Sequence, residues 1–225
     1  MDNLPAGRAD VRRWGVRWDN LFDDLESQLA HELSADELDI QAEEERLRLA
    51  RLGLRDRLLA IHAGGGSPDD RMLRLALTDG SRACVVPSNF GRDWFSGDLA
   101  SPSGRWSSCV VPIAAIAALS LSRQQVLRSL EAPTPGDGVP SAAPSALSER
   151  LGLSLVLRDL CRRRAAVEIA LIGGAAGGTR VHGTIDRVGR DHLDLAVHDR
   201  TSARRERAVT EIRIVPLAQI ALVRL

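Results

Sequence analysis

The sequence predicts an α+β protein with two small five-stranded β-barrels in tandem, each preceded by a helix, behind an N-terminal acidic helical arm. Three observations support this fold class. A helix-forming stretch followed by short apolar strands occurs twice, in residues 51–121 and 147–225. Gly-containing turns of the kind that connect β-hairpins separate the strands. A one-sided run of acidic residues precedes both copies.

The first feature that the two copies share is a helix. Each copy opens on an Arg-Leu-Gly-Leu sequence, which begins at Arg51 and again at Arg150. Apolar residues then recur at i, i+4 and i+7, a spacing that places them on one face of an α-helix. They are Leu54, Leu58 and Ile61 in the first copy and Leu153, Leu157 and Leu160 in the second.

Strands and turns follow the helix in the same order in both copies. The first two strands are expected at residues 72–77 and 82–86, and at residues 167–172 and 180–185. A Gly-Arg-Asp element precedes the third strand, and Val-Pro-hydrophobic-Ala-x-Ile closes each copy, starting at Val111 and Val215. Because proline donates no ladder hydrogen bond, it should end the fourth strand. A 3₁₀ turn over residues 217–219 should then lead into a last strand at 220–225.

Five short strands cannot stand as an open sheet, because the edges and one apolar face would be exposed. Curling into a small barrel buries that face. The preceding helix can close one end of the barrel with its leucine stripe. The repeat therefore predicts two small barrels.

The first 17 residues carry four arginines around Trp14 and are expected to form a flexible basic tail. An alternative is an anchor for an acidic surface or a nucleic-acid backbone, since arginine binds phosphate through a planar fork.

Residues 18–50 are expected to form an acidic helical arm. Eleven acidic residues and no Lys or Arg lie between Asp19 and Glu45. Ser34 to Glu37 has the form of a capping box, which predicts that a second helix begins there and continues towards Ile61. Five apolar residues recur at helical spacing: Trp18, Leu21, Phe22, Leu25 and Leu29. Either this stripe packs on the barrels, or it docks a partner.

The remaining segments complete the expected domain organisation. The first barrel with its flanking helices covers residues 51–131 and the second covers 147–225. A short helix at 121–131 should be capped by Ser122. Its residues Val126, Leu127 and Leu130 should point inward. Residues 132–146 form a Pro/Gly linker that has no means to bury a core.

Composition gives a net charge of zero, with thirty Lys plus Arg against thirty Asp plus Glu. Excess arginines follow the acidic arm and are expected on the barrels. No apolar run approaches the length of a membrane span, and the N-terminus lacks the apolar region of a signal peptide, so a cytoplasmic protein is expected. The three cysteines form no C-x-x-C pair and are expected to be reduced thiols.

No motif indicates catalysis. The five histidines have no metal-ligand spacing. The glycine-rich stretch at 173–178 lacks the Gly-Lys-Ser/Thr of a phosphate-binding loop and lies between strands. We therefore expect no enzyme activity, no cofactor and no metal.

The order of a helix, five short strands and a Gly-Arg-Asp element before the third strand resembles the Sm-like fold, a small barrel of the SH3-like kind. The similarity covers most of 147–225 and, more loosely, 51–121. The layout also resembles that of uncharacterised actinobacterial proteins. In the Sm-like family, subunits assemble into rings through strand four of one against strand five of the next. The resemblance therefore implies that two barrels in one chain pair internally in this way.

The resemblance also implies a site for RNA. The first Sm motif carries an aromatic residue and an Asn in the RNA-contacting loop, and residues 181–197 resemble it. His192 then takes the aromatic position and Asp194 the Asn position, while Trp94 and Ser96 take them in the first copy. Asn is absent from both copies, and Val215-Pro216 replaces the Arg-Gly of the second motif. The resemblance therefore supports the fold better than the activity.

Two functions are consistent with the sequence. The first is a non-enzymatic interaction or scaffold protein, in which barrels and arm dock a protein partner or each other. The alternative is an RNA-binding protein in which a base stacks on Trp94 or His192. The candidate nucleic-acid-binding residues are Trp94, Arg92, Arg190, His192, Arg200, Arg204, Arg205 and Arg207.

Overall fold

A computed structural model describes residues 15–101, 104–132, 150–173, 179–200 and 209–225. The chain divides into two compact units, Met1–Arg51 and Leu52–Leu225. The predicted linker at 132–146 falls almost entirely outside the described residues.

The described part of the first unit is one continuous helix, α1, from Gly15 to Arg51. The prediction that a second helix begins at Ser34 is therefore wrong. The helix formers before and after the Ser34-Glu37 sequence favour continuation over a break. The helix also does not run on towards Ile61. It ends before Gly53, whose extended backbone (φ −76°, ψ 154°) leads into a separate helix.

The Leu52–Leu225 unit contains the two sequence copies, which we call the first half (52–132) and the second half (150–225). The helices of the first half are α2 (Leu54–Gly64), α3 (Pro68–Arg71) and α4 (Arg123–Leu130). Its strands are β1 (Leu73–Leu77), β2 (Arg82–Phe90), β3 (Trp94–Ala100), β4 (Trp106–Pro112) and β5 (Ile116–Ser120). The second half has helix α5 (Leu153–Arg162). Its strands are β6 (Ala166–Leu171), β7 (Thr179–Val188), β8 (His192–Val197), β9 (Glu211–Pro216) and β10 (Ile220–Arg224).

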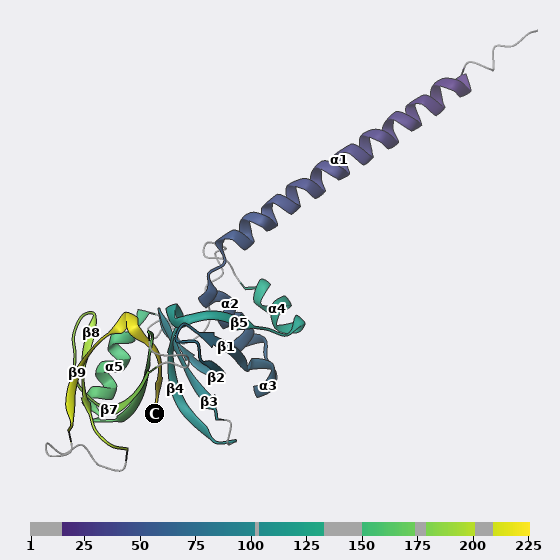
Figure 1. The fold of residues 1–225 in the computed structure, drawn as a ribbon. Coiled ribbons are helices and arrows are strands. Elements are labelled where there is room, and N and C mark those ends of the chain that lie inside the picture. Colours follow the sequence, from purple (N-terminus) through teal and green to yellow (C-terminus); the bar gives the residue numbers. More distant parts are fainter. Residues whose placement is uncertain (1–14, 102–103, 133–149, 174–178, 201–208) are drawn as a thin grey trace, which may run out of the picture. The chain divides into compact units, whose positions relative to one another are not determined.

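The strands form one ten-stranded antiparallel sheet in the order β5-β1-β2-β3-β4-β10-β6-β7-β8-β9 (Figure 1). The α+β class is therefore confirmed. The two separate barrels are not confirmed, because β4 of the first half pairs with β10 of the second and makes the sheet continuous. No helix in the described part of the chain is long and apolar enough to cross a membrane.

The duplication is visible in this strand order. Each half begins with its fifth strand (β5 or β10) and ends with its fourth (β4 or β9), with the first three strands between them. The register repeats as well. Arg74 of β1 lies opposite Cys84 and Ser120, and Glu168 of β6 lies opposite His182 and Arg224. Equivalent positions in the two halves can therefore be compared directly.

Each half has its own apolar core. The helix faces predicted from leucine spacing are buried, apart from Leu54, which is exposed at the start of α2. The core of the second half also contains Trp94 and Val110, which come from the first half. The two cores are thus joined where β4 meets β10.

The ends of the fourth strands follow the sequence prediction. β4 ends at Pro112 and β9 at Pro216, and a 3₁₀ turn follows each, Ile113–Ala115 and Leu217–Gln219. Each turn leads directly into the fifth strand of its half.

Helix α4 is capped by Ser122, as predicted, but its inward face is different. Gln125 and Ser129 are buried, whereas Val126 and Leu127 are exposed. The buried amide of Gln125 donates to the carbonyl oxygens of Asp70 (3.1 Å) and Met72 (3.0 Å). These bonds satisfy the carbonyls and fix the orientation of α4.

Candidate interaction surfaces

The joint between the halves begins with the pairing of β4 and β10. Val223 lies opposite Val110 and Arg224 lies opposite Cys109. The backbone N–H of Leu225 then donates to the carbonyl oxygen of Ser108, 2.9 Å away. The fourth strand of one half is therefore hydrogen-bonded to the fifth strand of the other.

A turn of the first half also docks on the start of helix α5. The indole Nε1 of Trp94 and the backbone N–H of Arg92 both donate to the carbonyl oxygen of Leu151, at 2.9 and 3.0 Å. The carboxylate of Asp93 accepts a bond of 2.8 Å from the N–H of Leu153, the first residue of α5. This is the role of an N-terminal capping group, although Asp93 comes from the other half.

The second half repeats the same turn, and there Arg158 of its own helix α5 donates to the carbonyl oxygen of Gly189 (3.4 Å). Gly189 N–H donates to the carbonyl of His192 over 2.8 Å, as Gly91 N–H does to the carbonyl of Trp94. Here, however, the ring of His192 is exposed. Its Nδ1 lies 2.8 Å from Asp191 Oδ1. The carboxylate of Asp191 therefore bonds the adjacent His192, whereas the equivalent carboxylate, that of Asp93, caps helix α5.

The fourth strands show the same contrast. Val110 of β4 is 3 % exposed because β10 covers it, whereas Ile214, its equivalent on β9, is 68 % exposed. Ile212 on the same strand is also exposed. β9 is one end of the sheet, where unpaired backbone groups and apolar side chains form a template for another strand.

The opposite end of the sheet carries an apolar hollow of about 360 Å³ beside β5. Its walls include Leu54, Ile61 and Leu119. The equivalent residues of the second half are Leu153, Leu160 and Val223, which pack with Trp94 and Val110 in one core. In the second half, the corresponding space is filled by the side chains of Trp94 and Val110. The hollow of the first half is therefore equivalent to that filled space.

The structure does not bring the residues predicted to bind nucleic acid together in one site. Trp94 is buried in the joint, so its ring faces are not available for a base to stack on. His192, Arg92, Arg190 and Arg200 are exposed. Arg92 lies beside Asp93, and Arg200 forms an ion pair with Glu168. Arg204, Arg205 and Arg207 lie outside the described residues.

The predicted partner-docking residues Trp18, Leu21, Phe22, Leu25 and Leu29 all belong to α1. Leu25 is exposed, and the side chains of the other four lie outside the described part. Further along α1, Leu38, Ile40 and Leu47 are exposed too. This helix therefore presents several apolar side chains at its surface.

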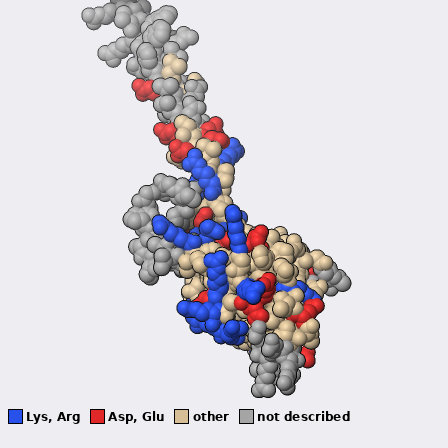
Figure 2. Space-filling view, turned by 90° about the vertical axis from the view of Figure 1, so that its left-hand side faces the viewer, with Lys and Arg blue, Asp and Glu red and all other residues tan. Residues whose placement is uncertain are grey.

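Basic side chains gather on the face shown in Figure 2, on the side of the second unit where α5, β8 and β9 lie. Exposed arginines on α5 and around the β7–β8 turn include Arg158, Arg162, Arg163, Arg164, Arg187 and Arg190. Several are neutralised locally. Asp159 accepts bonds from both Arg162 (2.8 Å) and Arg163 (2.7 Å), and these two arginines lower the pKa of the carboxylate.

Sequence reasoning missed the exposed edge of β9. The signal for this edge was the alternation of charged and apolar residues in Glu211-Ile212-Arg213-Ile214. The equivalent segment of the first half, Ser107-Ser108-Cys109-Val110, has no such alternation. These two isoleucines indicate an exposed sheet edge only once the strand order places β9 at the end of the sheet. Among the described residues, no group of three or more His, Cys, Asp or Glu side chains is placed to hold a metal ion.

Comparison with known proteins gave no match to a family model, to a curated protein or to a solved structure.

Proposed function

We propose that this chain is a non-enzymatic interaction protein that assembles with copies of itself, head to tail. The end carrying β9 and the 189–192 turn of one copy would dock on the end carrying β5 and the apolar hollow of the next. The observation that carries this proposal is the contrast between buried Val110 and exposed Ile214. The same position is covered by a fifth strand in one half and uncovered in the other.

The pairing of β4 with β10 inside the chain is the model for the contact that we propose between copies. A fourth strand against a fifth strand is a heterologous pairing, which uses two different surfaces and leaves one of each unused. The unused surfaces are β9 and β5, the two ends of the sheet. Such contacts build closed rings or open filaments, according to the rotation between successive copies.

We further propose that each half is a small barrel of the Sm-like kind. Its support is that each half has its own core and that both long second strands are bent by bulges. The register shifts between Pro87 and Asn89 in β2 and between Ile185 and Arg187 in β7. Bulges of this kind increase strand twist and help a sheet to curl.

The first experiment is sedimentation velocity of the full chain over a range of concentrations. The wild type should form higher assemblies as concentration rises, and Ile214→Lys should shift the chain to monomer because a charge on the edge opposes pairing. Leu155→Lys, at an exposed leucine of α5, is the matched control and should assemble like the wild type. A wild type that stays monomeric at all concentrations would overturn the proposal.

A mixing experiment separates head-to-tail assembly from a symmetric interface. Ile214→Lys blocks the β9 end, and Ala118→Lys places a charge on exposed β5 and blocks the other end. Each variant alone should be monomeric. Their mixture should form a 1:1 dimer, since one variant retains β5 and the other retains β9. Assemblies that survive in either variant alone would show that another surface is used.

RNA binding is the second candidate, and the observation in its favour is that His192 and Arg190, two residues apart in the chain, are both exposed. Labelled single-stranded RNA should then bind the full chain in a salt-dependent manner, and binding should weaken in His192→Ala. No binding at low salt would reject this function.

A further inference from the structure

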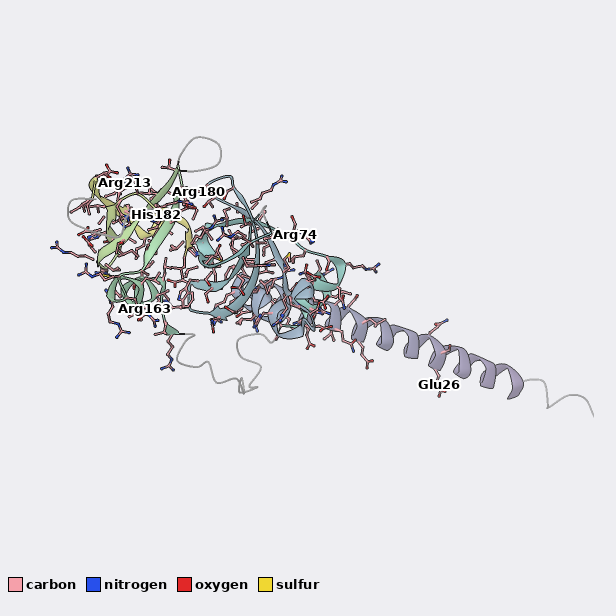
Figure 3. The ribbon with its side chains drawn as sticks, turned by 90° about the horizontal axis from the view of Figure 1, so that it is seen from below. Glu26, Arg74, Arg163, Arg180, His182 and Arg213 are labelled. Atoms are coloured by element: carbon pink, nitrogen blue, oxygen red, sulfur yellow. The ribbon has the colours of Figure 1, made fainter. Side chains whose placement is uncertain are left out.

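A second hollow, of about 390 Å³, lies on the second half and is polar. It is formed where the start of β7 faces the end of β8 and the start of β9. The side chains around it include Arg180, His182, His198, Asp199, Arg200 and Arg213. Arg180, His182 and Arg213 come together in Figure 3 on β7 and β9.

Positive charge is in excess around Glu168, the ion-pair partner of Arg180 and Arg200, which both line this hollow. Glu168 of β6 is buried, and three guanidinium groups converge on its carboxylate. Arg180 Nη1 lies 3.8 Å and Arg224 Nη1 lies 3.7 Å from Glu168 Oε1, and Arg200 is also an ion-pair partner. One carboxylate neutralises one of these three cations.

The excess charge affects Arg224 itself. Burial lowers its pKa from the ordinary value, and repulsion by Arg180 and Arg200 lowers it further. Asp199 supplies one more negative charge at the rim, and Arg213 is paired with Glu211. An additional anion in the hollow would therefore relieve repulsion among arginines that the fold already holds together.

Two histidines, His182 and His198, also line the hollow. His198 is buried, with Nδ1 3.0 Å from the carbonyl oxygen of Asp199 and Nε2 2.9 Å from Thr184 Oγ1. The carbonyl can only accept, so Nδ1 carries a proton. His182 stands edge-on to His198, with ring centroids 5.2 Å apart. Neither ring nitrogen of His182 has a hydrogen-bond partner among the described residues.

We propose that this hollow binds a dianionic phosphate, either inorganic phosphate or the phosphate group of a small phosphomonoester. Arginine forks match phosphate oxygens in pairs, and Arg180 and Arg200 come from different sides of the hollow. His182 supplies a further N–H donor. The volume is at the lower end of small-molecule sites, which suits a ligand of this size.

The duplication provides a built-in comparison. In the first half, the positions of Glu168, His182 and Arg224 are occupied by Arg74, Cys84 and Ser120. Only the position of Arg180 keeps its residue type, as Arg82. The first half thus has neither the organising carboxylate nor the histidine, so a phosphate site is expected in the second half alone.

The test is calorimetric titration of inorganic phosphate into the full chain at low ionic strength, with sodium chloride of equal ionic strength as reference. Arg180→Ala and Arg200→Ala should each weaken phosphate binding about tenfold or more, since each removes a charge-assisted hydrogen bond. Arg82→Ala is the matched control and should bind like the wild type. No phosphate heat beyond that of chloride, or an equal loss in Arg82→Ala, would overturn the proposal.

Two further arms settle the source of the phosphate and guard against misfolded variants. Adenosine monophosphate should compete with inorganic phosphate, whereas a short single-stranded RNA without terminal phosphate should not. Equal competition by that RNA would overturn the monoester proposal and assign the hollow to a nucleic-acid backbone. In the wild type, phosphate should shift the ring proton resonances of His182 in NMR spectra, and unchanged resonances would also reject the site.

Discussion

The indole nitrogen of Trp94 donates a hydrogen bond to the carbonyl oxygen of Leu151, 2.9 Å away, and so ties a turn of the first half to the start of α5 in the second. His192 occupies the equivalent position of the second half and is exposed. The Gly-Arg-Asp turn therefore occurs twice in the sequence, but the residue that follows it is buried in the first half and exposed in the second. The difference follows from what each turn contacts, because the first turn docks on the start of α5.

Trp94→Phe should destabilise the Leu52–Leu225 unit by about 1 kcal/mol, because it removes one buried hydrogen bond while keeping an aromatic ring in the core. Trp94→Ala should cost about 3–5 kcal/mol, since it also leaves a cavity in the joint. Urea unfolding followed by circular dichroism measures both effects without relying on tryptophan fluorescence.

The matched control for this prediction is Trp106→Phe. Trp106 begins β4 and is 54 % exposed, so its replacement should change the free energy of unfolding by less than about 0.5 kcal/mol. If Trp94→Phe were as mild as Trp106→Phe, the bond to Leu151 would contribute nothing to the joint.

A pair of glycines offers a second comparison. A Cβ on Gly91 would lie 2.1 Å from Trp94 Nε1 and 2.7 Å from the carbonyl oxygen of Leu151, both fixed in the joint. A Cβ on Gly189 would lie 2.7 Å from the ring of His192, which is exposed and whose hydrogen-bond partner Asp191 is exposed too.

Gly91→Ala should therefore destabilise by about 1–3 kcal/mol or more through overpacking, and Gly189→Ala by clearly less. Thermal unfolding of the two variants under identical conditions compares them. Equal losses would mean that the turns are equally constrained, which would contradict the docking of the first turn on α5.

Much of the fold was predictable from local patterns. Leucines at helical spacing identified the buried faces of α2 and α5. The prolines after Val111 and Val215 correctly marked the ends of the fourth strands and the 3₁₀ turns. These features depend on residues near one another in sequence, where proline geometry and side-chain periodicity act directly.

The rest depended on contacts between distant residues. Ser34 has the sequence of a helix start, yet α1 passes through it because the flanking residues favour helix on both sides. Trp94 has the sequence position of a base-stacking residue, yet it is buried because β4 meets β10 and brings α5 against the turn. The polar hollow is lined by residues from the start of β7, the end of β8 and the start of β9, so no short stretch of sequence could indicate it.

Cys109 lies in the joint opposite Arg224, and its thiol should be inert in the folded protein. Burial, and next the negative charge of Asp98, raises its pKa to about 12. Because the thiolate is the reactive form, iodoacetamide should modify half-buried Cys84 and Cys161 well before Cys109.

Peptide mass mapping after timed alkylation measures this order, and the urea-unfolded chain, in which all three thiols react, is the control. Trp94→Ala should speed the labelling of Cys109, because opening of the joint exposes it. Labelling of Cys109 at the same rate as Cys84 in the folded wild type would contradict the closed joint.

Acid should weaken the fold through His62, whose ring lies 5.5 Å from that of Phe90, centroid to centroid. Burial, and next the positive charge of Arg71, lowers its pKa below the ordinary 6.5, despite a backbone contact with Pro87 that acts in the opposite direction. Above pH 6.5 both the folded and unfolded chains keep this ring neutral, so stability does not change. Below it, the unfolded chain binds the proton first, and the free energy of unfolding falls as pH drops towards the folded pKa.

Urea unfolding at about pH 7.5 and about pH 5.5 should therefore show a loss of stability in acid that is smaller in His62→Gln than in the wild type. His182 has a pKa lowered in the same direction, by burial and then by His198, so part of the loss should remain in the variant. An identical loss in the wild type and in His62→Gln would show that His62 titrates alike in the folded and unfolded chains.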